Sequence, residues 1–249
     1  MSTYHSKKAK EFLKDPKKVE RHDRTFWSLR QKRDAAAAEL PEWEDLREHT
    51  SRIKEHTATH LADYLEQFSN SLERNGVIVH FAKDAQEFNE MVYGILESHK
   101  VKKLVKSKSM LTEECEMNPY LIKRGINVVE SDLGERILQL MHLKPAHIVM
   151  PAIHLTRDEI GEMFEEKGIS KEKGNHDPTY LTRCAREDLR GDFMDADAGL
   201  TGCNFGVAAT GDCVVCTNEG NADMSTSVPK LHIVAMGIEK VIPDYDSLA

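Results

Sequence analysis

The 249-residue chain is long enough to bury a sizeable core as one large α/β domain with an appendage. Its 40% hydrophobic and 31% charged residues are typical of a soluble globular protein, and its net charge of -8 argues against a nucleic-acid partner. The apolar runs fall far short of the ~20 residues of a membrane span, and the Lys-rich start lacks the apolar core of a signal peptide. We therefore expect a cytoplasmic protein without a membrane span, in which the five cysteines are reduced thiols.

The start of the chain predicts a basic helical arm. Residues 2–38 carry many Lys and Arg side chains and few large apolar ones. Such a helix either docks onto an acidic partner or is a solvated helix that Phe26 and Trp27 pack against the body of the protein.

A second long helix is predicted over residues 41–75. Pro41 suits a helix start, and Gly76 can end the helix with a left-handed cap. His56 and His60 are spaced as in some zinc sites, but no third ligand lies nearby in sequence, which favours surface histidines.

From Gly76 onward, short strands alternate with helices, so we divide the chain into an arm, residues 1–75, and an α/β domain, residues 76–249. Repeated βα alternation predicts a mainly parallel, doubly wound sheet. Right-handed crossovers then place the strand ends that point in the same direction along one edge of the sheet. The predicted strands are 77–81, 103–106, 127–130, 147–150 and 231–236, and the predicted helices are 84–99, 112–124, 133–141, 156–167 and 179–195.

Residues 205–209 and 214–217 predict a hairpin, because both are short and largely apolar and the link between them contains Gly211, which can take a positive φ. Their continuous apolar character suggests strands covered on both faces. Asn218, Glu219, Gly220 and Asn221 follow directly, and in open α/β sheets ligands bind outside the carboxyl ends of strands. These four residues, with Thr210 and Gly211 at the turn, are candidate ligand-binding residues. The alternative is an ordinary polar turn.

Polar residues follow other predicted strands too. Lys106, Ser107, Lys108 and Ser109 precede a predicted helix start, so they form either an anion site for a phosphate or carboxylate or a basic surface loop. His154 is either a general acid or base or a merely hydrogen-bonded imidazole. Acids at residues 130–135 likewise come after a strand.

Cys213 and Cys216 form a CxxC pattern, which invites a metal or redox interpretation in a cytosolic protein. Residues three apart on a strand point to opposite faces, so the two sulfurs are not expected to bind one ion. The other cysteines form no second CxxC, and we expect no metal in this chain.

Several segments in order along the chain together resemble the lactate utilization protein B family, which carries a LUD domain. The resemblance implies a fold related to the NagB/RpiA/CoA-transferase superfamily. It also implies a role in oxidising L-lactate to pyruvate within a multisubunit, iron–sulfur-containing cytoplasmic complex with companion utilization proteins. The segments are WEDLREHTSRIKEHT, VKSKSMLTEE, ESDLGERILQL, HIVMPAIHLTRDEI, ADAGLTGCNFGVAATG, TNEGNAD and PKLHIVAMGIEKVIP.

Members of that family carry a ferredoxin-like, cysteine-rich region behind the part resembled here, whereas this sequence ends at Ala249. We therefore expect a truncated chain, with [4Fe-4S] clusters in the missing region and none in this chain. A natural short form is the alternative.

Two classes of function follow. In the first, the chain is the LUD part of a lactate-oxidising complex and binds a small carboxylate or organises subunits, with the 106–109 and 218–221 loops lining the site. In the second, which the superfamily resemblance suggests, Glu219 acts as the nucleophile of a CoA-transferase-like enzyme. A purely structural interaction module is a third possibility. No catalytic residue is assigned, and Glu219 and His154 are the candidates.

Overall fold

A computed structural model describes residues 3–147 and 150–248. Its centre is a four-stranded, wholly parallel sheet with strand order β2-β1-β3-β6. The predicted α/β class with a parallel, doubly wound sheet is confirmed. The strands are β1 (Lys103–Lys106), β2 (Asn127–Glu130), β3 (Ala198–Gly202) and β6 (Leu231–Ala235).

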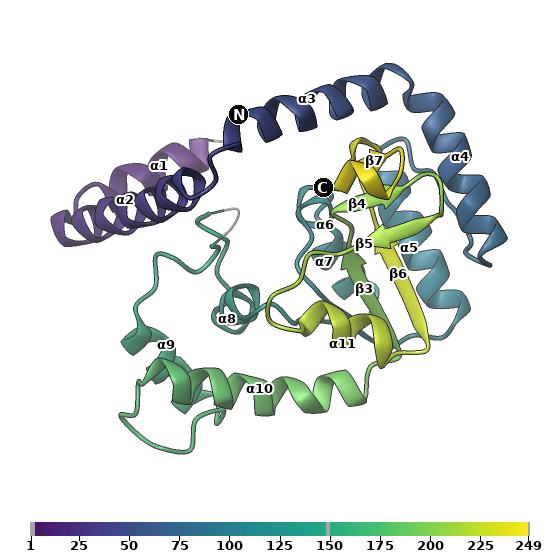
Figure 1. Cartoon of the computed structure of the whole chain (residues 1–249). Coiled ribbons are helices and arrows are strands. Elements are labelled where there is room, and N and C mark those ends of the chain that lie inside the picture. The colour runs from purple at the N-terminus through teal and green to yellow at the C-terminus, as the bar shows by residue number, and fades with distance from the viewer. Residues whose placement is uncertain (1–2, 148–149, 249) are drawn as a thin grey trace.

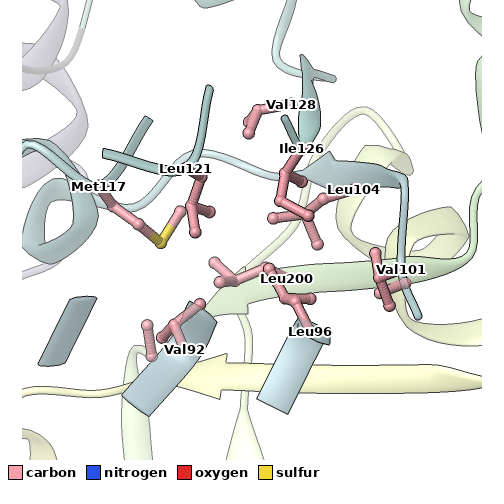
Figure 2. Packing of buried hydrophobic residues seen from close by; sticks show 11 residues of the cluster. Val92, Leu96, Val101, Leu104, Met117, Leu121, Ile126, Val128 and Leu200 are labelled. Atoms are coloured by element: carbon pink, nitrogen blue, oxygen red, sulfur yellow. The ribbon is translucent and has the colours of Figure 1, made fainter. Parts of the chain in front are cut away.

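Helices cover both faces of this sheet because neighbouring strand residues point to opposite sides. On one face, Leu104 and Leu200 pack with Leu96 of α5 (Ala85–Ser98) and Leu121 of α7 (Met117–Ile122), as Figure 2 shows. On the other face, Val105 and Val129 pack with Leu189 and Phe193 of α10 (Pro178–Met194). The two clusters hold the strands in place, and with them the strand ends.

The remaining helices of the domain connect these layers. They are α6 (Met110–Glu114), α8 (Leu133–Met141), α9 (Arg157–Glu166) and α11 (Asn221–Ser227). Helix α9 begins with a complete capping box, in which the Thr156 hydroxyl accepts from the Glu159 N–H at 3.2 Å and the Glu159 carboxylate accepts from the Thr156 N–H at 2.7 Å. Short 3₁₀ turns cover Ile238–Lys240 and Tyr245–Leu248.

The predicted hairpin exists, but it belongs to a second sheet. Strands β4 (Phe205–Val207) and β5 (Asp212–Val214) pair antiparallel, and β7 (Val241–Ile242) joins β4, giving the order β5-β4-β7. Gly211 has a φ of +77°, as its turn requires. The second strand of the hairpin, β5, begins and ends earlier than predicted. Its residues are only half-buried, so the prediction that it is covered on both faces was wrong.

Strand β3 was not predicted, although it lies in the middle of the parallel sheet. Its sequence, AGLTG, has one β-branched residue, Thr201, and no aromatic residue, so it carries little of the signal that marks strands. Small residues are needed there because α11 crosses closely. A Cβ on Gly199 would lie 1.8 Å from the backbone oxygen of Ser225.

The predicted strand at 77–81 was wrong. That segment has no strand structure, and Val77, Ile78 and Phe81 are 46%, 80% and 56% exposed. An apolar run becomes a strand only when a neighbouring strand completes its hydrogen bonds. The predicted strand at 147–150 includes residues 148–149, which lie outside the described residues, and neither His147 nor Met150 is in a strand.

Two predicted helices are broken. The 112–124 helix divides into α6 and α7 at Glu116, which has a φ of +50°, because Pro119 fits the first turn of a helix but not its interior. The 41–75 helix divides at His60 into α3 (Trp43–Thr59) and α4 (Leu61–Arg74). Gly76 ends α4 with a φ of +83°, as predicted. His56 and His60 are exposed, as expected.

The basic arm consists of α1 (Thr3–Phe12) and α2 (Pro16–Ala38), which lie side by side away from the sheet (Figure 1). Phe26 packs on His147, with ring centroids 5.0 Å apart. Trp27, expected to pack as well, is 63% exposed, because neighbouring helix residues point in different directions. None of the described helices is long and apolar enough to cross a membrane.

Candidate functional site

The carboxyl ends of β1 and β2 place a lysine beside a glutamate. Lys106 and Glu130 are the last residues of their strands and are paired in register. The Lys106 side chain is fully buried, and its ammonium lies 2.6 Å from Glu113 Oε1 and 2.9 Å from Glu130 Oε1. It also donates to the Thr112 hydroxyl at 3.2 Å. Burial alone would lower the pKa of Lys106, but the two carboxylates outweigh it and raise that pKa.

This arrangement changes what Lys106 can do. Its ammonium is occupied by two carboxylates, so direct contact with a ligand would require one of them to leave. Its physical role is to hold together the end of β1, the end of β2 and helix α6. A buried ion pair of this kind is costly to break from one side.

Glu135, near the start of α8, completes an acidic group with Glu113 and Glu130. Ligand oxygens of the three side chains all lie within 4.8 Å of one another. Glu135 Oε2 and Glu130 Oε2 are buried and receive no N–H or hydroxyl from the described residues, although the two carboxyl groups lie close enough to share a proton. Burial, and then repulsion by Glu130, raise the pKa of Glu135 to about 9, so that carboxyl holds a proton at neutral pH. Within the described chain these are the residues whose geometry suits a metal ion.

The 106–109 loop is mostly buried. The Ser107 N–H donates to the Leu200 carbonyl at 2.9 Å, so it is not free for an anion. Ser109 is buried at the start of α6, and Lys108 is half-buried. Lys108 is therefore the lysine of this loop that is not fully buried.

The structure brings the 218–221 loop to the same edge. Glu219 is exposed, yet its carboxyl is partly withdrawn from water and lies beside Asp132, and these effects raise its pKa to about 7. The Lys108 ammonium opposes that rise in pKa, so it lies close enough to interact electrostatically with the Glu219 carboxyl. Gly220 takes a φ of +77° and leads into Asn221, the first residue of α11. Asp132 caps α8 by accepting from the Glu135 N–H at 3.1 Å.

Two sets of candidate residues lie elsewhere. Thr210 and Gly211 pack on the end of α4, where the Thr210 carbonyl accepts from Asn75 Nδ2 at 2.9 Å and a Cβ on Gly211 would lie 2.7 Å from the Leu72 nitrogen.

His154 contacts the arm, since its carbonyl accepts from Arg21 Nη2 at 2.6 Å. Burial lowers the pKa of His154, which favours the neutral imidazole. Neither set joins the 106–109 and 218–221 loops.

The CxxC cysteines do not act together. Cys213 lies in β5, whereas Cys216 is exposed beyond the strand. The Cys213 thiol is hydrogen-bonded to that of Cys203, which raises the pKa of Cys203 and lowers that of Cys213. Cys213 therefore pairs with Cys203 and not with Cys216, the other cysteine of the CxxC pattern.

Sequence reasoning missed Glu113 and Glu135 as site residues, because Glu113 was explained as a helix-start acid and Glu135 was noted only among the acids that follow a strand. A signal was available. Two neighbouring predicted strands end in Lys106 and Glu130, and opposite charges at the aligned ends of adjacent parallel strands predict an ion pair there.

Comparison with known proteins places the chain in a family. A model of the LUD domain matches residues 65–249. Two relatives named lactate utilization protein B are 47% identical over 221 residues, in Bacillus pumilus, and 45% identical over 218 residues, in an Exiguobacterium species. Each comparison covers 88% of this chain and 46% of the relative, so the chain spans about half the length of these relatives. No solved structure matches it. Since the LUD-domain match extends from α4 through the whole α/β domain, the chain belongs to the LUD-domain family.

Proposed function

We propose that this chain is the LUD-domain part of a lactate utilization protein and binds a small carboxylate, L-lactate or pyruvate, at the edge formed by Lys108, Asp132 and Glu219. The main support is its 44–47% identity to proteins named lactate utilization protein B. The finer proposal is a cytoplasmic, multisubunit complex that oxidises L-lactate to pyruvate. Companion utilization proteins are its partners, and [4Fe-4S] clusters lie outside the part of the relatives matched here.

The observation that carries the binding proposal is the meeting of two loops from distant parts of the sequence. Lys108 follows β1 and Glu219 precedes α11, yet their side chains share one electrostatic environment with Asp132. This lies at the carboxyl ends of parallel strands, where open α/β sheets bind ligands. The buried Lys106 network keeps the loop anchors rigid, which lowers the entropy cost of binding.

A calorimetric titration of the 249-residue protein tests this proposal. We expect L-lactate and pyruvate to bind and Lys108→Ala to weaken both. Lys102→Ala is the matched control, because Lys102 is exposed at the opposite end of β1. Absence of binding by both acids, in the presence or absence of divalent cations, would overturn the proposal, as would equal effects of the two lysine variants.

A second candidate, acyl transfer, is favoured by the accessibility of Glu219 and by the glycine that follows it. In that reaction the Glu219 carboxylate attacks an acyl-CoA thioester and releases CoA thiolate, which then attacks the resulting anhydride and expels the free acid. The product is a glutamyl-CoA thioester. Incubation with acetyl-CoA should add the mass of CoA less water to the wild type and nothing to Glu219→Gln. An unmodified wild type retires this candidate.

A further inference from the structure

Three carboxylates converge at the end of β2 from three separate elements. Glu113 comes from α6, Glu130 from the end of β2 and Glu135 from α8, and their ligand oxygens lie within 4.8 Å of one another. The Glu130 side chain is only 5% exposed, and its Oε2 receives no N–H or hydroxyl from residues 3–147 and 150–248, so the neighbouring Glu135 carboxyl is the described group that can offer it a proton. A buried carboxylate oxygen without a partner is costly, so it points to an occupant.

The local charge supports the same conclusion. The Lys106 ammonium ion-pairs with two of the three carboxylates, at Oε1 of Glu113 and Oε1 of Glu130. Glu130 Oε2 and Glu135 Oε2 receive no N–H or hydroxyl from the described residues, so apart from a proton shared between these two carboxyls the group keeps excess negative charge. The carboxyl groups of Asp132 and Glu219 add negative charge nearby, and Lys108 offsets only part of that charge. A small carboxylate would be repelled from such an edge unless further positive charge were present.

We propose that Glu113, Glu130 and Glu135 bind a hard divalent cation, such as Mg²⁺ or Mn²⁺, and that this ion receives the carboxylate and hydroxyl oxygens of a 2-hydroxycarboxylic acid. The ligand part of this inference rests on the proposed function. An all-oxygen set of donors selects Mg²⁺, Mn²⁺ or Ca²⁺ over softer metals. A 2-hydroxy acid offers two oxygens that form a five-membered chelate ring with such an ion, and so overcomes the repulsion by the surrounding acids.

A proton is the competing occupant. In the absence of a cation, Glu135 carries the proton that partly relieves the charge, and a metal ion must displace it because ligands bind metals in their deprotonated form. The test must therefore measure the metal directly.

The 249-residue protein is first depleted of metal. It is then titrated with Mn²⁺, and binding is measured as the loss of the free-ion signal in electron paramagnetic resonance. A separate titration with Mg²⁺ is measured by calorimetry. We expect one ion per chain. Glu135→Gln should weaken binding by at least about tenfold, since even outer-shell changes cost that much. This variant keeps both Lys106 ion pairs, so it is expected to fold. Glu114→Gln, exposed and adjacent to Glu113, is the matched control and should bind as the wild type does.

Failure of the wild type to bind Mn²⁺ and Mg²⁺ would overturn the inference and leave the proton as the occupant. Equal binding by Glu135→Gln and Glu114→Gln would overturn it too. A second titration with L-lactate, with and without Mg²⁺, separates the inference from the proposed function. Lactate binding that needs Mg²⁺ supports both. Equal lactate binding in a chelator overturns the ligand role of the ion and keeps the proposed function. Metal binding without any binding of lactate or pyruvate keeps the ion site and overturns the proposed function.

Discussion

Replacing Lys106 with methionine tests whether its ion pairs organise the end of the sheet. Methionine keeps a long, flexible, apolar side chain in the fully buried position but removes the ammonium that lies 2.6 Å and 2.9 Å from Glu113 and Glu130. Removing one partner of a buried ion pair typically costs about 3–5 kcal/mol, because the remaining charge stays buried without compensation. We therefore expect Lys106→Met to lower the free energy of unfolding by about that amount.

Lys103→Met is the matched control, because Lys103 begins the same strand and pairs with Asp192 at 3.0 Å. Its side chain is 24% exposed, and Asp192 also lies 3.4 Å from Arg136 Nη2, so the loss of Lys103 leaves Asp192 with a cationic partner. The expected loss is about 1 kcal/mol or less.

Urea unfolding followed by circular dichroism measures both variants against the wild type. Equal losses in the two variants would refute the reasoning.

Three further predictions concern other parts of the fold. Gly199→Ala should lower the free energy of unfolding by about 3 kcal/mol or more, because its Cβ would overlap a backbone oxygen of α11. The control Gly94→Ala, at an exposed helix position, should raise the free energy of unfolding by about 0.5–1 kcal/mol. Calorimetric melting compares the two variants, and similar melting temperatures would contradict the packing of β3. The Glu219 carboxyl should titrate near pH 7 in carbon-detected NMR, and Asp132→Asn should lower that midpoint; an unchanged midpoint would contradict their proximity. The hydrogen bond to Asp158 raises the pKa of His176. The stability that His176 contributes to the folded protein is therefore complete below pH about 6.5 and is lost as the pH rises through the raised pKa. Parallel curves of stability against pH for the wild type and His176→Asn would contradict this.

Local patterns were sufficient where one element carried its own boundary signals. Strands β1 and β2 were predicted residue for residue, since each is a short apolar run between helix start and stop signals. Helix α9 was predicted within one residue at each end, because the capping box at Thr156 and the glycine at 168 define both ends.

Local patterns failed where a partner element decides the outcome. Residues 77–81 have the apolar character of a strand, but no strand of the described chain pairs with them to complete the ladder. Ala198–Gly202 has the opposite character and is central to the sheet, because only small residues allow α11 to cross at Gly199.

The candidate site shows the same division. Polar residues after β1 and before α11 were identified from sequence and predicted to face each other at one sheet edge, although residues 218–221 follow a strand of the second sheet and not one of the parallel sheet. Sequence did not show that Lys106 is buried in ion pairs, or that Glu135 faces Glu130. Those contacts join residues from α6, β2 and α8, whose relative placement depends on how the helices pack on the sheet.

The sequence by itself determined the fold class, most helix boundaries and the resemblance to LUD-domain proteins, because periodicity, capping and motif order are properties of neighbouring residues. Only the tertiary structure decided which charges are buried, which strand is central and which cysteine Cys213 contacts. Burial and charge pairing depend on distances between residues far apart in the chain, and the packing of complete elements determines those distances.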